Sequence, residues 1–266
     1  MKAQLKAARR RMALLFMSRE ARRHALVGPP QLWEMKRKFQ IDYLRAQGLR
    51  PEHVLLDIGC GTLRGGIPLI DYLQPGHYHG VETRAEVLDE GRRELQEAGL
   101  SGKAPVLWVS EDLGGEEREH RYNWAWAFSV LIHMPDAVAE GTLSFLGRHL
   151  VDDGQFHANV NLGERREGNW QGFPVVWRSL DFYRDMAARH GLQVEDVGSL
   201  HALGHRSGAE SQDEQRMLAS GARAEARAQA QKKARRSGLF YGAGPIRPRL
   251  SAAPKPARRR GRSPRA

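Results

Sequence analysis

The chain has 266 residues, a single cysteine and a formal net charge of +11, from 42 basic and 31 acidic side chains. One cysteine excludes an intramolecular disulfide and a cysteine-cluster zinc site. No apolar run reaches the roughly 18 to 20 residues that a membrane-spanning helix needs. We therefore expect a cytoplasmic protein without a transmembrane segment.

The positive charge lies at the two ends of the chain. Residues 1–24 contain eight basic and one acidic side chain, and residues 221–266 contain 14 and one. The segment 25–220 is left with 20 basic and 29 acidic side chains, a net charge of −9. An acidic domain argues against a nucleic-acid groove on its surface, whereas the basic ends keep open a nucleic acid or another anionic surface as a partner.

Composition divides the chain into three parts. Residues 1–30 form a basic arm with an expected amphipathic helix over 4–26, either docked or solvated, with a membrane-surface or targeting role as the alternative. Residues 31–205 are long enough for one domain. Residues 206–266 are basic and of low complexity, and we expect them to be largely disordered, with a solvated helix over 211–236 as the alternative.

In the middle part, a helix over residues 31–47 that stops at Gly48 precedes alternating strands and helices. We predict strands over 53–58, 77–82, 105–109, 123–129 and 154–160, with a closing pair over 193–198 and 199–204. Helices are expected over 64–73, 84–98, 136–150 and 179–190. This alternation predicts a doubly wound α/β domain, in which ligands bind beyond the carboxyl ends of the strands.

The most informative segment is a glycine loop between a buried strand and a helix, in the string VLLDIGCGTLRGG from residue 54. Glycines let the backbone approach a ligand, and an acid that ends the next strand, Glu82, suits the ribose of an adenosine group. Dinucleotides and S-adenosylmethionine both contain an adenosine group, so either could bind at such a loop and acid. Asp57, two residues before Gly59, favours S-adenosylmethionine, because a carboxylate attracts an ammonium group and repels a pyrophosphate.

These residues resemble the first motif of the class I S-adenosylmethionine-dependent methyltransferases, an acid followed by alternating glycines. Asp57, Gly59 and Gly61 match it, whereas Leu63 replaces the third glycine and is followed by Arg64. The string GCGTLRGG is similar to that of a bacterial branch of the family. The resemblance implies S-adenosylmethionine as the cofactor and a Rossmann-like sheet of seven strands, the last pair antiparallel, with helices on both faces.

Further segments match the family in chain order. The resemblance implies that Glu82 binds the ribose, that Asp112 lies near the adenine amino group with Leu113 beside the ring, and that Glu111 is the rival acid. Phe128 begins the segment that lines the cleft for methyl transfer. The implied cofactor-binding residues are Asp57, Gly59, Cys60, Gly61, Arg64, Glu82, Asp112, Leu113 and Phe128. Simpler roles stay open: a helix cap for Asp57, packing for Cys60 and a surface ion pair for Arg64.

Methyl transfer from a sulfonium is an in-line displacement, so much of the acceleration comes from holding the acceptor in a water-poor cleft. His133 is the candidate catalytic base, because it follows the fourth strand and imidazole titrates near neutral pH; the alternative is a hydrogen bond to the backbone. Residues 163–177 are a candidate lid over the acceptor. No spacing of histidines and carboxylates predicts a metal site.

The sequence thus predicts a methyltransferase that acts on an oxygen or nitrogen of a small-molecule acceptor, such as a sugar, a lipid-linked compound or a secondary metabolite. One alternative is a methyltransferase tethered to RNA or an anionic surface by its basic ends. A second alternative is a scaffold that binds S-adenosylmethionine without transferring its methyl group, and a nicotinamide-dependent dehydrogenase is a distant third.

Overall fold

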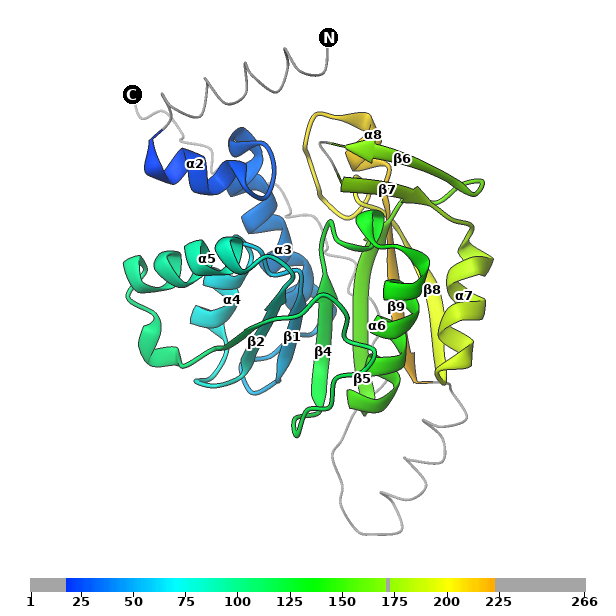
Figure 1. Ribbon diagram of the computed structural model, residues 1–266, viewed down its shortest axis with the longest axis horizontal. Helices are drawn as coiled ribbons and strands as arrows, with labels where there is room; N and C mark the ends of the chain where they lie inside the picture. Colours follow the sequence, from blue (N-terminus) through cyan, green and yellow to red (C-terminus); the bar gives the residue numbers. More distant parts are fainter. Residues whose placement is uncertain (1–17, 171–172, 223–266) are drawn as a thin grey trace, which may run out of the picture.

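The computed structural model describes residues 18–170 and 173–222, which form a seven-stranded sheet covered by helices on both faces (Figure 1). The strand order is β3-β2-β1-β4-β5-β9-β8. Their bounds are β1 (Leu55–Ile58), β2 (Tyr78–Glu82), β3 (Val106–Val109), β4 (Tyr122–Ala127), β5 (Leu150–Val160), β8 (Leu192–Ser199) and β9 (Arg216–Ala222). Strand β9 runs antiparallel to both β5 and β8. The predicted doubly wound sheet, with its last pair antiparallel, is confirmed.

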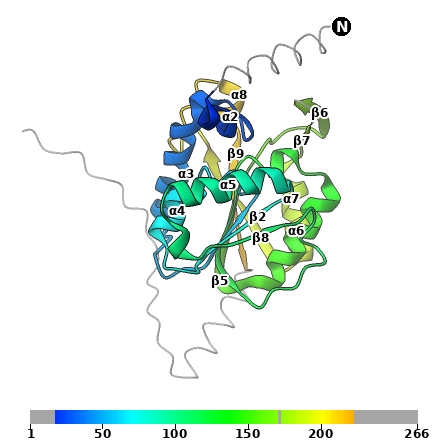
Figure 2. The ribbon, with the colours of Figure 1, turned by 60° about the vertical axis from the view of Figure 1, so that its left-hand side comes forward.

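The helices form two layers, which Figure 2 shows on opposite sides of the sheet. One layer contains α3 (Trp33–Gln47), α4 (Gly66–Tyr72) and α5 (Ala85–Glu97), and the other contains α6 (Asp136–His149) and α7 (Leu180–Arg189). Single turns occur at η1 (Pro30–Leu32), η2 (Ser101–Lys103), η3 (Leu131–His133) and α8 (Glu210–Asp213). Helix α3 ends as predicted at Gly48, whose φ of 107° is one that glycine adopts without strain.

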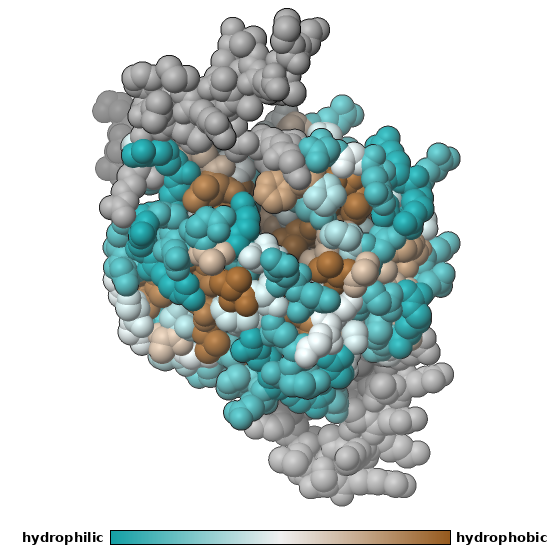
Figure 3. All heavy atoms as spheres, viewed as in Figure 1, coloured by the Kyte–Doolittle hydropathy of each residue, from teal (hydrophilic) through white to brown (hydrophobic). Residues whose placement is uncertain are grey.

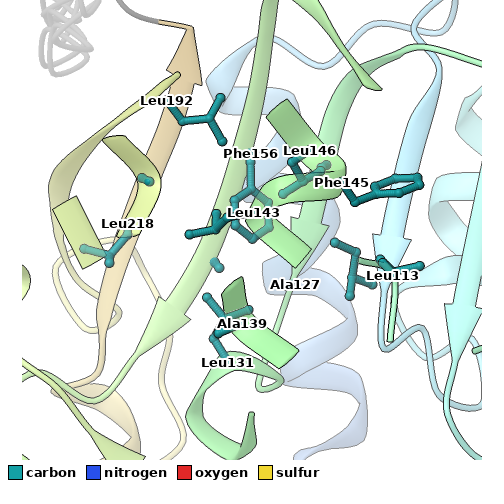
Figure 4. Packing of buried hydrophobic residues seen from close by; sticks show 14 of the residues in the cluster. Leu113, Ala127, Leu131, Ala139, Leu143, Phe145, Leu146, Phe156, Leu192 and Leu218 are labelled. Carbon is teal, nitrogen blue, oxygen red and sulfur yellow. The ribbon is translucent and has the colours of Figure 1, made fainter. Parts of the chain in front are cut away.

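Each layer has its own hydrophobic core. In the core under α6, side chains of the helix interdigitate with those of the central strands, as Figure 4 shows for Leu143, Phe156 and Leu218. The second core joins α3, α4 and α5 to the other face and contains the two indoles of β4, Trp124 and Trp126. Because all residues of β1 and β2 are buried, polar side chains on them lie either inside the domain or at its ligand-binding edge.

Two elements extend beyond the sheet at the carboxyl ends of its parallel strands. Helix α2 (Arg19–Ala25) is the described part of the amphipathic helix predicted over 4–26; residues 4–17 lie outside the described ranges. The hairpin of β6 (Arg166–Trp170) and β7 (Phe173–Trp177) occupies the segment predicted as a lid loop. Figure 1 shows α2 and the hairpin on opposite sides of the upper edge of the sheet.

The domain extends further than its predicted boundary at residue 205. Residues 199–204, predicted as the last strand, form a turn instead, in which the His205 N–H donates to the Leu200 carbonyl. The last strand is β9, inserted between β5 and β8, so residues 216–222 belong to the sheet although they lie within the predicted basic tail of 206–266. Residues 223–266 lie outside the described ranges. In the described part of the chain, no helix is both long enough and apolar enough to cross a bilayer.

Candidate functional site

The carboxyl ends of β1, β2 and β4 bring most of the predicted site residues to one edge of the sheet. Asp57 is the third residue of β1, and Glu82 ends β2; both side chains are buried. Phe128 follows the last residue of β4 directly. Figure 3 shows hydrophobic side chains at a hollow on this face, above the end of β4. These strand ends therefore define the candidate site.

The glycine loop takes the conformation that its sequence predicts. Gly59 and Gly61 have φ values of 69° and 59°, in the left-handed region that other residues rarely adopt. A Cβ atom on Gly59 would lie 2.4 Å from a methyl carbon of Val130, and one on Gly61 would lie 2.8 Å from a methyl carbon of Val27. Both positions therefore require glycine, for conformation and for space. Cys60 is buried, and its N–H donates to the Val81 carbonyl.

Leu63, which replaces the family's third glycine, keeps a glycine-like backbone with a φ of 59°. Its side chain is fully buried in the core, where it lies close to the Cα atoms of Gly66 and Gly91. The strain of this conformation, about 1 to 3 kcal/mol, is offset by that burial. The loop thus keeps its backbone shape without the third glycine, and Leu63 contributes to the core.

Asp57 is a buried carboxyl group whose environment favours its neutral form. Burial raises its pKa to about 7, and the nearby Glu82 adds to this rise. The Tyr78 hydroxyl donates to Oδ2 of Asp57 at 2.5 Å, and Arg64 is close enough to favour the anion; both oppose the shift. A cationic group bound beside Asp57 would restore the carboxylate form.

Glu82 is bonded mainly to its own loop. Its Oε2 accepts the Gly61 N–H at 3.0 Å, while Oε1 accepts from the Thr83 hydroxyl and from the backbone and side chain of Arg84. Because a carboxylate oxygen accepts about two hydrogen bonds, Oε2 has room for one more donor. This arrangement fits the predicted binding of a ribose hydroxyl.

The segment that follows α2 covers the glycine loop. The Val27 carbonyl accepts from the Arg64 guanidinium at 3.1 Å, and the Leu26 carbonyl accepts from that of Arg84 at 3.4 Å. The Val27 side chain faces Gly61 directly. The basic arm is thus docked on the domain in its described part, and its end forms one wall of the site.

The phenyl ring of Phe128 is the floor of the cleft beside β4. It stacks on Trp126 with 5.6 Å between ring centroids, and the His205 ring lies 5.8 Å away. The Lys36 ammonium, from α3, lies 5.9 Å above the same ring. Phe128 therefore lies between Trp126 of the core and two polar groups, one from α3 and one from the turn before β9.

His133 lies between β4 and the hairpin. Its Nδ1 is 2.7 Å from the Pro174 carbonyl, which can only accept, so Nδ1 carries the proton and Nε2 a lone pair. Burial lowers the pKa of His133, which keeps the imidazole neutral at pH 7. The ring of Phe173, on β7, lies 6.1 Å from that of His133 and 5.3 Å from the Arg84 guanidinium. The hairpin thus reaches across the cleft towards the end of β2.

Asp112 and Leu113, predicted at the adenine end, follow β3. The Asp112 carboxylate accepts the N–H of Gly114 at 2.8 Å and lies against Gly141, in the middle of α6. Leu113 is buried in the core beneath α6, as Figure 4 shows. Glu111, the rival acid, is exposed. The structure therefore brings together Asp57, Gly59, Cys60, Gly61, Arg64, Glu82, Phe128 and His133. The Ser110 N–H donates to the Glu82 carbonyl, so the segment that leads to Asp112 and Leu113 starts beside the end of β2, and their contact with adenine stays a prediction.

Sequence reasoning missed three polar residues of the cleft. Lys36 reaches it from the first turn of α3, and His205 and Asp213 reach it from the turn and short helix before β9. Nδ1 of His205 is 2.7 Å from Oδ1 of Asp213, whereas its buried Nε2 has no partner within the described ranges. The sequence indicates these residues only weakly. Lys36 is a lysine in the helix predicted over residues 31–47, and His205 lies at the edge of the predicted tail.

The donor set fits S-adenosylmethionine. Glu82 has a lone pair for a ribose hydroxyl, Asp57 matches an ammonium group, and the two glycines keep the loop open to a close approach. The Nε of Arg64 is buried without an acceptor within residues 18–170 and 173–222, so one donor of the site has capacity for a ligand. Within the same ranges, no three metal-binding side chains are grouped to hold a metal ion.

Comparisons with known proteins bear on the fold of the domain. Residues 56–156 match the family model of the methyltransferase domain. The magnesium protoporphyrin IX methyltransferase of Synechocystis PCC 6803, solved with bound S-adenosylmethionine, is similar over 71% of this chain and 80% of its own, with 19% identity and a TM-score of 0.52. No curated protein matches the sequence.

Two further solved structures share the fold. The glycopeptide N-methyltransferase MtfA matches over 70% of this chain and 90% of its own, with 15% identity and a TM-score of 0.54. The CcbJ methyltransferase of Streptomyces caelestis matches over 74% and 92%, with 15% identity and a TM-score of 0.53. The chain is thus similar to the methyltransferase domain family over residues 56–156, and it shares the fold of these three methyltransferases.

Proposed function

We propose that the protein binds S-adenosylmethionine at the glycine loop and transfers its methyl group to an oxygen or nitrogen of a small-molecule acceptor in the cytoplasm. The observation that carries this proposal is the pair of buried acids, Asp57 and Glu82, at the ends of adjacent strands on either side of the loop. Solved structures of similar fold bear the names of enzymes that act on a porphyrin and on a glycopeptide, which supports a small acceptor.

In this proposal, the bound cofactor supplies a methyl group on a positively charged sulfur. Glu82 holds the ribose and Asp57 holds the ammonium group, while Phe128 provides an apolar surface beside the reacting end. The hairpin excludes water, because Phe173 reaches both His133 and Arg84. An acceptor held in line within this cleft would gain most of the acceleration from orientation.

We further propose His133 as the proton acceptor for substrates that must lose a proton. Its hydrogen bond to Pro174 fixes the tautomer in which Nε2 can accept a proton, and its lowered pKa keeps that nitrogen unprotonated at pH 7. A neutral amine can attack the methyl group without first losing a proton. With such an acceptor, His133 would not be needed as a base in that step.

The test uses the full chain with methyl-labelled S-adenosylmethionine and fractionated metabolite extracts. Mass spectrometry of the products is expected to show the label on one class of small molecule, and calorimetry is expected to show binding of S-adenosylmethionine and S-adenosylhomocysteine. Label that appears only on added RNA would favour the tethered alternative. Binding without transfer to any acceptor would favour the silent scaffold.

A further inference from the structure

Two buried cations of the cleft, Lys36 and Arg64, have no ion-pair partner in the described part of the chain. Lys36 is 8% exposed and Arg64 9% exposed, and no carboxylate oxygen lies within 4.0 Å of either side chain. An unpaired buried charge costs several kcal/mol, so buried cations in proteins are normally paired. These two therefore lack a partner that their burial requires.

The two side chains converge at the contact between α3 and the glycine loop. Gly65, next to Arg64, lies against Gln40: a Cβ on Gly65 would be 2.5 Å from the Gln40 side-chain oxygen. Lys36 is one helical turn before Gln40 and on the same face of α3, and the Gln40 amide donates to its backbone carbonyl at 3.1 Å. Packing of this face on the loop thus places both cations at one end of the cleft.

The pKa values of Lys36 and Arg64 are consistent with two buried cations that lie close together. Burial lowers the pKa of Lys36 to about 7, and repulsion by Arg64 contributes to the fall. Burial also lowers the pKa of Arg64 to about 10. Mutual repulsion of two desolvated cations is removed when an anion binds between them.

The two acids whose charge favours the protonated forms of Lys36 and Arg64 form their hydrogen bonds with other residues. Asp213, which partly opposes the shift of Lys36, accepts from His205 at 2.7 Å and from the Ser207 N–H at 3.0 Å. Asp57, which partly opposes the shift of Arg64, accepts from Tyr78. The described protein therefore offers donors to an anion at this place, and the Arg64 Nε has no acceptor at all.

We propose that Lys36 and Arg64 bind the α-carboxylate of S-adenosylmethionine. The ribose acid Glu82 ends β2, whereas both cations lie towards β1 and β4, so a ligand anchored at Glu82 directs its amino-acid end to them. Asp57 beside Arg64 supplies the opposite charge for the ammonium group, and the three side chains together match a zwitterion. This inference rests on the proposed function, because it names the part of the cofactor that each charge holds.

The test compares S-adenosylmethionine with decarboxylated S-adenosylmethionine, which keeps the sulfonium and the amine. Isothermal titration of the full chain is expected to show that loss of the carboxylate weakens binding about 10- to 100-fold, the size of one or two charge-assisted hydrogen bonds. The variant Lys36→Met is expected to lose about tenfold in affinity for S-adenosylmethionine and to bind the decarboxylated ligand within twofold of the wild type. Lys36→Arg is expected to keep most of the discrimination.

The matched control is Lys38→Met, which removes an exposed lysine of the same helix that is paired with Asp42. It is expected to leave both affinities unchanged. Equal binding of the two ligands by the wild type, or equal weakening of both in Lys36→Met, would overturn the inference and assign the cations to the acceptor. If the wild type binds neither ligand, the proposed function fails, and this inference fails with it.

Discussion

Arg23 and the pair of Lys36 and Arg64 are cations of similar burial with opposite surroundings. Arg23, on α2, is 3% exposed and meets three carboxylates of α5: Glu90, Glu94 and Glu97. These hydrogen bonds raise its pKa, whereas the pKa of each cleft cation is lowered. The charge of Arg23 is paired within the chain, whereas we propose that the charges of Lys36 and Arg64 pair with a ligand. Pairing therefore distinguishes a structural charge from a binding charge where burial does not.

The largest effect is expected at the acids that oppose the cleft cations. Asp57→Asn and Glu82→Gln keep the side-chain shape but remove the charge that holds an ammonium group or accepts ribose hydroxyls. We expect each variant to bind S-adenosylhomocysteine about 100-fold more weakly, because hydrogen bonds to charged groups contribute about 1.5 to 3 kcal/mol each. Calorimetry measures the affinity, and circular dichroism checks the fold. Wild-type affinity in both variants would remove these acids from the site.

Substitution of a histidine in the cleft is expected to lower turnover more than it lowers the affinity for the cofactor. His133→Asn should lower kcat about tenfold or more with cofactor affinity within twofold, because general-base catalysis contributes to the transition state alone. His201→Asn is the control, since that side chain is exposed. Full activity in His133→Asn, with loss of activity in His205→Asn, would transfer the role to the pair of His205 and Asp213.

Loss of a balanced charge should act on stability. Arg23→Met removes a cation that Glu90, Glu94 and Glu97 of α5 share, so we expect about 2 kcal/mol of destabilisation and a Tm lower by roughly 4 to 8 °C. Arg22→Met, which alters the exposed neighbour on the same helix, is the control. A similar Tm in both variants would show that the docking of α2 does not depend on these pairs.

Removal of the unpaired Lys36 should increase the stability of the fold, and this is the smallest effect that we expect. In the unfolded chain Lys36 titrates near 10.5, and in the fold near 7, so the folded state binds fewer protons between these values. The cost of this lysine is then largest below pH 7 and fades as the pH rises towards 10.5. Lys36→Met should be more stable than the ligand-free wild type by about 1 kcal/mol at pH 7.

Denaturant unfolding at several pH values between 6 and 10 measures this difference. The advantage of Lys36→Met should shrink as the pH rises, since the wild-type lysine loses its proton in the fold. A difference that stays constant over this range would mean that Lys36 titrates normally and is not desolvated in the cleft.

The sequence predicts elements whose residues carry their own pattern. The run before Asp57 is apolar, as is typical of buried parallel strands, and β2 is buried along its whole length although it contains His79. The predicted strands and helices there lie within a few residues of the observed ones. Strand β9 reads RMLASGA, with small and polar residues and no alternation. Its conformation comes from backbone pairing with β5 on one side and β8 on the other, which no local pattern records.

The same contrast applies to the site. Asp57, Gly59, Gly61 and Glu82 were predictable because their roles depend on spacing along a strand, a loop and the next strand. Lys36 and His205 reach the cleft only after α3 and the turn before β9 have packed on the sheet. Asp112 also depends on spacing, since it follows β3 as predicted and its carboxylate accepts the Gly114 N–H; its contact with adenine stays a prediction.

The position of β9 also constrains how the protein is made. Strand β5 has one edge on β4, and its other edge pairs with β9, whose first residue, Arg216, follows the end of β5 by more than 50 positions. While the chain leaves the ribosome, this edge of β5 stays unpaired until residue 222 has emerged, and an open edge invites pairing with another chain. Strand β8 then joins the sheet only through β9. Completion of the sheet is therefore a late event in synthesis, and truncated chains that end before residue 216 and so lack β9 are expected to aggregate.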